Sequence, residues 1–371
     1  MADTDSEPES LIDQLIPASF FNLIEQERLF LILIGIFIFL AGVSYPYPHI
    51  AMWVGFALAG YSAIANDSIQ TIGTFIASNE DKKWWVLWLY VGLIFIGTVS
   101  YSWYFFDGDV SHGRLLSKGF SEQPDTFTFL QIGAPIFLLI LTRLRMPVST
   151  TFLLLSCFSA SAGAIGNVLT KSVSGYFVAF IAAIIVWFVF AGVFTKYFKG
   201  EPHPAWSVAQ WLTSGTLWSV WIMQDAANIA VYLPRSLNFG QFAAFALYIF
   251  FGLGILFYLR GDKIQSVVRE KANVTDIRAA TSIDFVYAVI LYYFKIKSQI
   301  PMSTTWVFIG LLAGREIAIT FSKYYKEQTS PAKAFRMIGR DFGFAMIGLV
   351  VSIILATSIN PELYKELISY F

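Results

Sequence analysis

The sequence has little of what disulfide-bonded or metal-binding proteins need. Its 371 residues include one cysteine and three histidines, and only 13% are charged. A single cysteine forms no intrachain disulfide, and three scattered histidines give no metal-ligand spacing. We therefore expect Cys157 to be a small buried apolar residue. The sequence contains neither a phosphate-loop lysine motif nor a catalytic-triad pattern, so it predicts no enzyme and no cofactor. Zero net charge argues against a nucleic-acid partner.

Apolar residues are abundant instead, at 56% of the chain. This content far exceeds that of soluble domains and predicts an integral membrane protein embedded in a lipid bilayer. The apolar runs are continuous and approach the length of a membrane-spanning helix, without the alternation of a barrel. We expect an all-α polytopic membrane protein with about eleven hydrophobic segments. They lie at roughly 28–45, 49–78, 84–106, 127–144, 147–168, 175–197, 206–233, 241–259, 279–296, 301–321 and 341–360.

Charge in the connections predicts the orientation. Residues 1–27 form an acidic tail, the opposite of a basic signal-peptide start, and we place this N-terminus in the cytosol. Connections 260–278 and 322–340 are rich in lysine and arginine, which favours the cytosolic side. Connections 107–126 and 169–174 carry little positive charge and are expected outside. The prediction is a multi-pass protein of the cell membrane, plasma or inner.

One short motif occurs twice. Pro147-Val148-Ser149-Thr150-Thr151 returns as Pro301-Met302-Ser303-Thr304-Thr305, and each copy opens an apolar run. Each is expected to be a proline-started helix N-terminus, where free N–H groups and the helix dipole favour an anion. The residues predicted to bind an oxyanion are Ser149, Thr150, Thr151, Ser303, Thr304 and Thr305.

A second motif also occurs twice and contains a carboxylate between two amides. A carboxylate near the bilayer centre costs about 2.5–3.5 kcal/mol, so it favours a functional role. The alternative is that it bonds to backbone or helix ends in packed protein. Carboxylate and amide oxygens suit sodium, and a carboxylate can also bind a proton. The predicted cation-binding residues are Asn66, Asp67, Gln70, Gln224, Asp225 and Asn228, with sodium at Asp67 and Asp225.

Both motifs recur in the same order, in halves with opposite expected sidedness. This is typical of the inverted repeats of secondary transporters. We assign residues 46–198 to the first repeat and 199–371 to the second, with 28–45 as an extra transmembrane helix. The helices around the motifs are expected to be broken or re-entrant at the midplane, and the sequence leaves open whether they cross fully.

Together the motifs resemble those of the PiT-type inorganic phosphate transporters, as in a divergent member of that family. The resemblance spans about residues 49–360. The matching residues are Asn66, Asp67, Gly73, Thr74, Pro147, Val148, Ser149, Thr150, Thr151, Asp225, Asn228, Pro301, Ser303, Thr304 and Thr305. It implies a secondary active transporter that imports inorganic phosphate with sodium or a proton by alternating access, and a possible homodimer. It also implies that the hydroxyl residues hold phosphate and that the amide and carboxylate residues hold the cation.

The sequence departs from the family pattern at several positions. Residues that differ are Ile64, Gln70, Phe152, Ile222, Gln224, Val231 and Trp306. Two alternatives stay open: a carrier of another tetrahedral oxyanion such as sulfate, and a non-transporting membrane receptor or scaffold with the same fold. Basic residues before each proline motif, among them Arg143, either attract an anion or are helix-end charges that reach water.

Overall fold

The computed structural model describes most of the chain. The described residues are 25, 27–117, 120, 122–144, 146–159, 162–197, 200–259, 276–294, 303–324 and 330–368. Every regular element within them is helical, which confirms the all-helical prediction for this part of the chain. Nearly all of the predicted acidic tail, most of connection 260–278, and Pro301 lie outside the described residues.

The first half of the chain forms short and long helices in succession. These are α3 (Arg28–Ser44), α4 (Pro48–Ala63), η1 (Ile64–Ser68), α5 (Ile69–Ser78), α6 (Trp84–Phe105), α7 (Arg114–Ser117), α8 (Phe129–Arg143), η2 (Thr151–Leu155) and α9 (Ala162–Tyr197). The second half continues with α10 (Ala205–Ala230), α11 (Phe239–Tyr258), α13 (Ile277–Tyr292), α14 (Thr304–Phe321), α15 (Pro331–Ile359) and α16 (Pro361–Ile368). The segments η1 and η2 are π-helical, with a wider turn than an α-helix.

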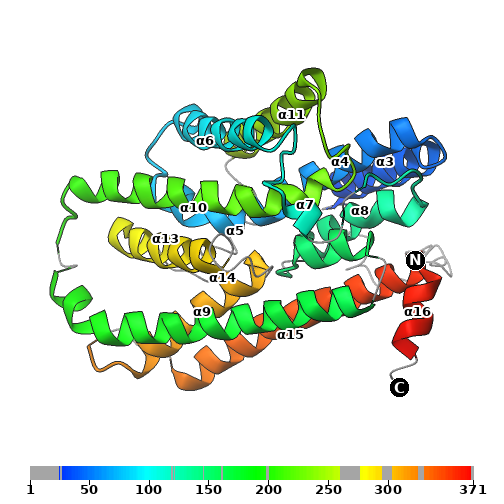
Figure 1. The fold of residues 1–371 in the computed structure, drawn as a ribbon. Helices are drawn as coiled ribbons and strands as arrows, with labels where there is room; N and C mark the ends of the chain where they lie inside the picture. The colour runs from blue at the N-terminus through cyan, green and yellow to red at the C-terminus, as the bar shows by residue number, and fades with distance from the viewer. Residues whose placement is uncertain are drawn as a thin grey trace, which may run out of the picture.

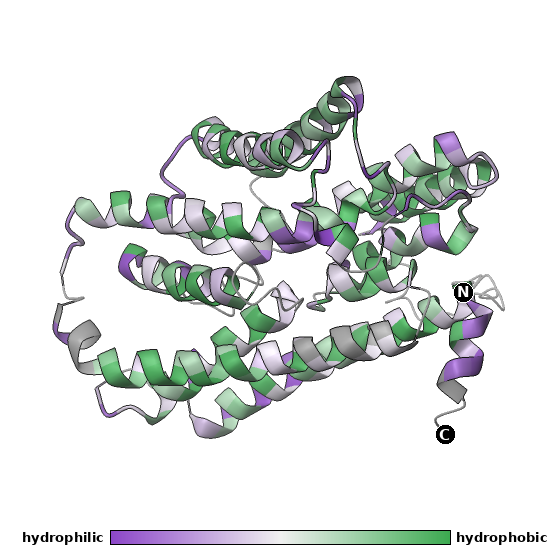
Figure 2. Ribbon diagram, viewed as in Figure 1, coloured by the Kyte–Doolittle hydropathy of each residue, from purple (hydrophilic) through white to green (hydrophobic). Residues whose placement is uncertain are grey.

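Six helical stretches within the described residues are long and apolar enough to cross a membrane, by length and composition. They are Pro48–Asp67, Trp84–Phe105, Ser172–Ala191, Phe239–Tyr258, Thr304–Phe321 and Pro331–Ile359. Six is fewer than the eleven expected. One reason is that α8 has only 15 residues, and a helix of that length covers roughly 22 Å. Figure 2 shows hydrophobic residues along the helices and hydrophilic residues at many turns and along α16, as expected for a multi-pass membrane protein.

The predicted connection at 169–174 is wrong. Helix α9 runs without interruption for 36 residues, from Ala162 to Tyr197. The prediction rested on the polar gap between the apolar runs 147–168 and 175–197, which includes Lys171. A lysine does not break a helix, however, and no proline lies in this stretch. The break falls earlier, between η2 and α9. The predicted segment 147–168 is therefore a short helical segment, a turn and the first residues of α9.

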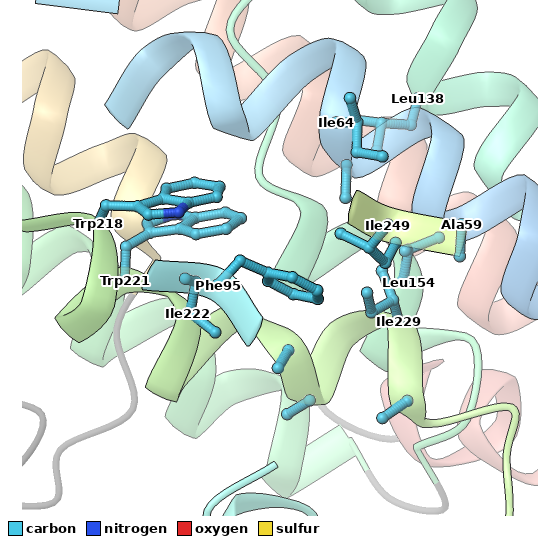
Figure 3. Packing of buried hydrophobic residues seen from close by; sticks show 14 of the residues in the cluster. Ala59, Ile64, Phe95, Leu138, Leu154, Trp218, Trp221, Ile222, Ile229 and Ile249 are labelled. Atoms are coloured by element: carbon cyan, nitrogen blue, oxygen red, sulfur yellow. The ribbon is translucent and has the colours of Figure 1, made fainter. Parts of the chain in front are cut away.

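Helix α10 lies at the centre of the bundle. Figure 1 shows the pair α6 and α11 on one side of it, α13 beside it, and α9, α14 and α15 on the other side, with α3, α4 and α8 gathered at one end. Trp218 and Trp221 of α10 stack with ring centroids 4.9 Å apart, as Figure 3 shows. The Trp218 indole also donates to the Val91 carbonyl of α6 at 3.0 Å. These contacts fix α10 against its neighbours, and α10 carries Asp225.

Helices α9 and α14 pack with their backbones close together. Gly310 and Gly314 lie one turn apart on α14, and a Cβ at either would overlap the carbonyl oxygen of Tyr176 or Phe180 on α9. Small residues at this spacing allow helices to approach closely inside a membrane. The contact sets the position of the Ser303–Thr305 helix start, because α14 begins there.

We expect Gly314→Ala to destabilise the protein by about 1–3 kcal/mol, since the added methyl group overlaps backbone that cannot rotate away. Thermal unfolding in detergent measures the effect. Gly97→Ala on α6 is the matched control, because nothing lies within 4 Å of a Cβ at that position. Equal melting temperatures for the two variants would contradict the close α9–α14 contact.

Candidate functional site

The Asp225 carboxylate is the centre of the candidate site. It lies in the C-terminal half of α10 and is 3% exposed. Thr304 Oγ1 donates to its Oδ2 at 2.8 Å, and Thr151 Oγ1 donates to its Oδ1 at 3.4 Å. Asn228, one turn further along α10, donates to Oδ1 at 2.9 Å and to Thr151 Oγ1 at 3.1 Å. One carboxylate thus accepts hydrogen bonds from both serine–threonine motifs.

Both motifs begin a helix in the same way, although three residues later than expected. Ser149 Oγ accepts from the Phe152 N–H at 3.2 Å, and Ser303 Oγ accepts from the Trp306 N–H at 3.4 Å. Each serine therefore caps its own helix, and the helix starts after it rather than at the proline. The prediction that Pro147 opens a helix is wrong, because residues 146–149 are not helical.

The two helix starts also differ in length. The first leads into η2, which has five residues, whereas the second leads into α14, which has 18. Aligned peptide dipoles add up along a helix. The two helix N-termini are therefore alike in their serine caps but not in the length of the helix that follows. The longer helix, α14, has the stronger dipole.

The first carboxylate, Asp67, lies in η1. A break in the helix was predicted here, and the structure has a π-helical turn instead. Asn66 Nδ2 donates to Asp67 Oδ1 at 2.8 Å and to the Val148 carbonyl at 3.0 Å. Thr305 Oγ1 donates to the same carbonyl at 3.2 Å, and Gln70 donates to Asn66 Oδ1 at 3.0 Å. The Val148 carbonyl thus joins the first amide–carboxylate motif to the second serine–threonine motif.

The structure brings all predicted site residues into the protein interior. The six hydroxyl residues are buried, as are Asn66, Asp67, Gln224, Asp225 and Asn228, while Gln70 is partly buried. None of the twelve lies on the exterior. Three of these hydrogen bonds connect the motifs of the two halves: Thr151 to Asp225, Asn228 to Thr151, and Thr305 to the Val148 carbonyl. The fold therefore brings distant segments of the chain together into one buried polar cluster.

Two buried oxygens in this cluster have no hydrogen-bond partner among the described residues. They are Thr150 Oγ1 and Asn228 Oδ1. Buried polar atoms are nearly always paired with protein, water or a bound ion. The Asn228 amide group already donates to Thr151 and Asp225, so only its oxygen is unused. Carboxylate, amide and hydroxyl oxygens such as these are the ligands that a hard cation prefers.

The sequence analysis did not identify Arg114 as a site residue. It considered the connection 107–126 only for its net charge, as a guide to orientation. Arg114 begins α7, which packs against α10. Asp109 positions this turn by accepting the N–H groups of Ser111 and Gly113, both at 2.7 Å. Burial lowers the pKa of the Arg114 guanidinium, and the negative charge of Asp225 raises it. A positive charge therefore interacts with the central carboxylate from the connection expected outside.

Asp284 is the second residue that was missed. It is buried on α13, where it accepts hydrogen bonds from Thr74 of α5 and Ser214 of α10. The signal was present in the sequence, since Asp284 is the only acidic residue in the apolar run 279–296. It belongs to neither repeated motif and therefore escaped the comparison of the two halves.

Arg143 does not serve the site as a free charge. Its guanidinium forms an ion pair with Glu27 at 2.6 Å and lies over the Phe30 ring. Arg143 therefore joins α8 to the start of α3. Arg145, Lys295 and Lys297 lie outside the described residues. Cys157 is buried, as predicted.

A group of aromatic residues packs next to the two serine caps. Trp306 lies 6.3 Å from Phe152, 6.4 Å from Tyr176 and 5.9 Å from Phe342, measured between ring centroids. Phe152 and Trp306 directly follow the two serine–threonine motifs. They are two of the residues at which the sequence departs from the PiT-type pattern, and here they pack near each other rather than against solvent.

Within the described residues, no group of three or more His, Cys, Asp or Glu side chains is arranged to hold a metal ion. No protein-family model matches the sequence, and the comparisons with curated proteins and with solved structures find no similar protein. The function is therefore proposed from the geometry of the site and from the resemblance of the two motifs.

Proposed function

We propose that this protein is a secondary active transporter that imports inorganic phosphate, coupled to sodium or protons. The observation that supports the proposal is the Asp225 carboxylate, which accepts hydroxyl groups from both serine–threonine motifs in the buried centre of the bundle. A carboxylate at this depth is unfavourable unless it has a function or a partner. Hydroxyl groups that can donate to a carboxylate can equally donate to a phosphate oxygen.

The hydrogen bonds suggest how cation and anion binding are coupled. The Asp225 carboxylate accepts hydrogen bonds from the hydroxyls of Thr151 and Thr304. A cation that binds Asp225, Asn228 Oδ1 and Thr150 Oγ1 neutralises the carboxylate and releases these hydroxyls. They then donate to the anion at the start of α14. Each ligand therefore increases the affinity for the other, as linkage requires.

Several parts of the proposal rest on the sequence patterns and on the resemblance. These are the inverted repeats at 46–198 and 199–371, the re-entrant helices, the possible homodimer, the cytosolic N-terminus and the plasma or inner membrane location. In this scheme the two repeats rock around the fixed central site, so that it opens to each side of the membrane in turn.

Two other functions fit the same cluster. A carrier of sulfate would use the same hydroxyl groups, and competition of sulfate against phosphate in a binding experiment separates the two. A non-transporting receptor or scaffold would keep the cluster without moving an anion, and the packed Phe152–Trp306 pair favours it because these rings fill space beside the site. Transport measurements separate the receptor from the carrier.

Uptake of radiolabelled phosphate into proteoliposomes tests the proposal. We expect accumulation above equilibrium when an inward sodium or proton gradient is imposed, and none when the gradients are collapsed. Binding of phosphate without accumulation under either gradient would favour a receptor. Accumulation of sulfate in preference to phosphate would change the substrate and keep the carrier.

A further inference from the structure

Asp284 forms a second polar centre that the proposed cycle has not used. The carboxyl group is 1% exposed. Thr74 Oγ1 of α5 donates to its Oδ1 at 2.5 Å, and Ser214 Oγ of α10 donates to its Oδ2. Three helices meet at this one side chain. Helix α10 also carries the second amide–carboxylate motif, and α5 follows directly on η1 and carries Gln70 of the first.

No cation compensates the charge of Asp284 within the described residues. The helices packed against α13 are α5, α9, α10 and α14, and α5 has no ionisable residue. The other ionisable side chains described as buried or half-buried on these helices are Asp225, Arg278, Tyr287, Tyr176, Arg315 and Glu316. None of them is hydrogen-bonded or ion-paired to Asp284. Arg278 pairs with Asp276 at 2.5 Å, and Tyr287 donates to the Thr304 carbonyl at 2.9 Å.

The partners of Asp284 differ in kind from those of the other two buried carboxylates. Asp67 and Asp225 each accept from an asparagine amide, which can only donate and therefore favours an ionised carboxylate. Both partners of Asp284 are hydroxyls, which donate or accept. A protonated Asp284 can donate to Ser214, whose own proton then turns to a backbone carbonyl of the preceding helical turn. This carboxyl group can thus gain or lose a proton without losing its hydrogen bonds.

A row of polar side chains leads from Asp284 to the surface. One turn along α5 and α10 lie Ser78 and Gln210, and Gln210 donates to Ser78 Oγ. Asn79 donates to Gln210 Oε1 at 2.8 Å, and the next residue, Glu80, is exposed in the turn before α6. In the other direction along α5, Gln70 donates to Asn66 of the central cluster at 3.0 Å. Asp284 therefore lies between the central site and one surface of the bundle.

We propose that Asp284 is a proton-binding site through which the carrier couples anion movement to a proton gradient. In each cycle the carboxylate takes a proton from water, which forms an O–H bond. That bond later breaks as the proton returns to water on the side of the α5–α6 turn, where the polar row favours water over an apolar surface. This inference rests on the proposed transport function. It assigns the proton to Asp284 and leaves Asp67 and Asp225 for a metal cation or for charge balance.

Asp284→Asn tests the coupling role, because asparagine keeps the shape of the side chain and the hydrogen bonds but binds no proton. Phosphate uptake driven by a proton gradient should fall at least about tenfold. Exchange of internal for external phosphate at equal pH should stay near the wild-type rate. Asp81→Asn at the exposed α5–α6 turn is the control and should behave as the wild type. Unchanged proton-driven uptake by Asp284→Asn would overturn the proposal, as would equal loss of uptake and exchange, which indicates a structural role.

Infrared difference spectra of the purified protein in lipid test proton binding separately from transport. On acidification, a protonated-carboxyl band should appear that is absent in Asp284→Asn. In Ser214→Ala, the midpoint pH of this band should rise, because a donor to the charged form is lost. The absence of such a band in the wild type would overturn the proposal even if phosphate is transported. A band that responds to sodium rather than to pH would overturn it too. If the band appears without phosphate transport, the proposed function fails while the proton site stands.

Discussion

Asp225→Asn is expected to abolish the dependence of phosphate binding and uptake on the coupling cation. The substitution keeps the size of the side chain but removes the charge that a cation would neutralise and the strong acceptor that holds Thr151 and Thr304. Coupling between two ligands is worth about 1–3 kcal/mol, which corresponds to about a 5- to 150-fold change in affinity. Equilibrium binding of radiolabelled phosphate, with and without sodium and across pH, measures this ratio, which should approach one in the variant.

The control for Asp225→Asn is Asp81→Asn, which removes a carboxylate whose side chain is 68% exposed. It should leave the ratio unchanged. The double variant Asp67→Asn, Asp225→Asn then asks whether the first carboxylate contributes, and it should show no gradient-driven uptake. A folded Asp225→Asn protein with wild-type cation dependence would mean that the cation binds elsewhere and that the central cluster is structural.

Trp306→Ala is expected to lower the free energy of unfolding by about 3–5 kcal/mol, the range for truncating a large buried aromatic side chain. Trp306 is fully buried and contacts Phe152, Tyr176 and Phe342 of three other elements, so its loss leaves a cavity that these elements cannot readily fill. Thermal or denaturant unfolding of the purified protein in detergent measures the change.

Trp85→Ala provides the matched control for Trp306→Ala. Trp85 lies on α6 and is 45% exposed, so its truncation leaves no cavity and should change stability by less than about 1 kcal/mol. Similar losses for the two variants would show that the aromatic group next to the serine caps does not hold η2, α9, α14 and α15 together.

The repeated motifs were the most informative part of the sequence. Comparison of the two halves identified Asp67 and Asp225 and the six hydroxyl residues, and the structure places all of them in the interior. The same comparison overlooked Asp284 and Arg114, because neither has a counterpart in the other half. The division into apolar runs also placed a connection at 169–174, where α9 is continuous. Hydropathy reports which residues avoid water, but a single lysine within an apolar run does not show whether the helix ends there.

The sequence by itself determined that this is a helical membrane protein with a few costly polar groups inside it. Composition and continuous apolar runs suffice for that conclusion, because a bilayer admits only segments that satisfy their own backbone hydrogen bonds. Only the tertiary structure decided which groups meet. The bond from Thr304 to Asp225 and the two hydroxyls on Asp284 join elements far apart in the chain. Such contacts depend on how α10, α13 and α14 pack against one another, for example through the close approach at Gly310 and Gly314, and local sequence does not encode that arrangement.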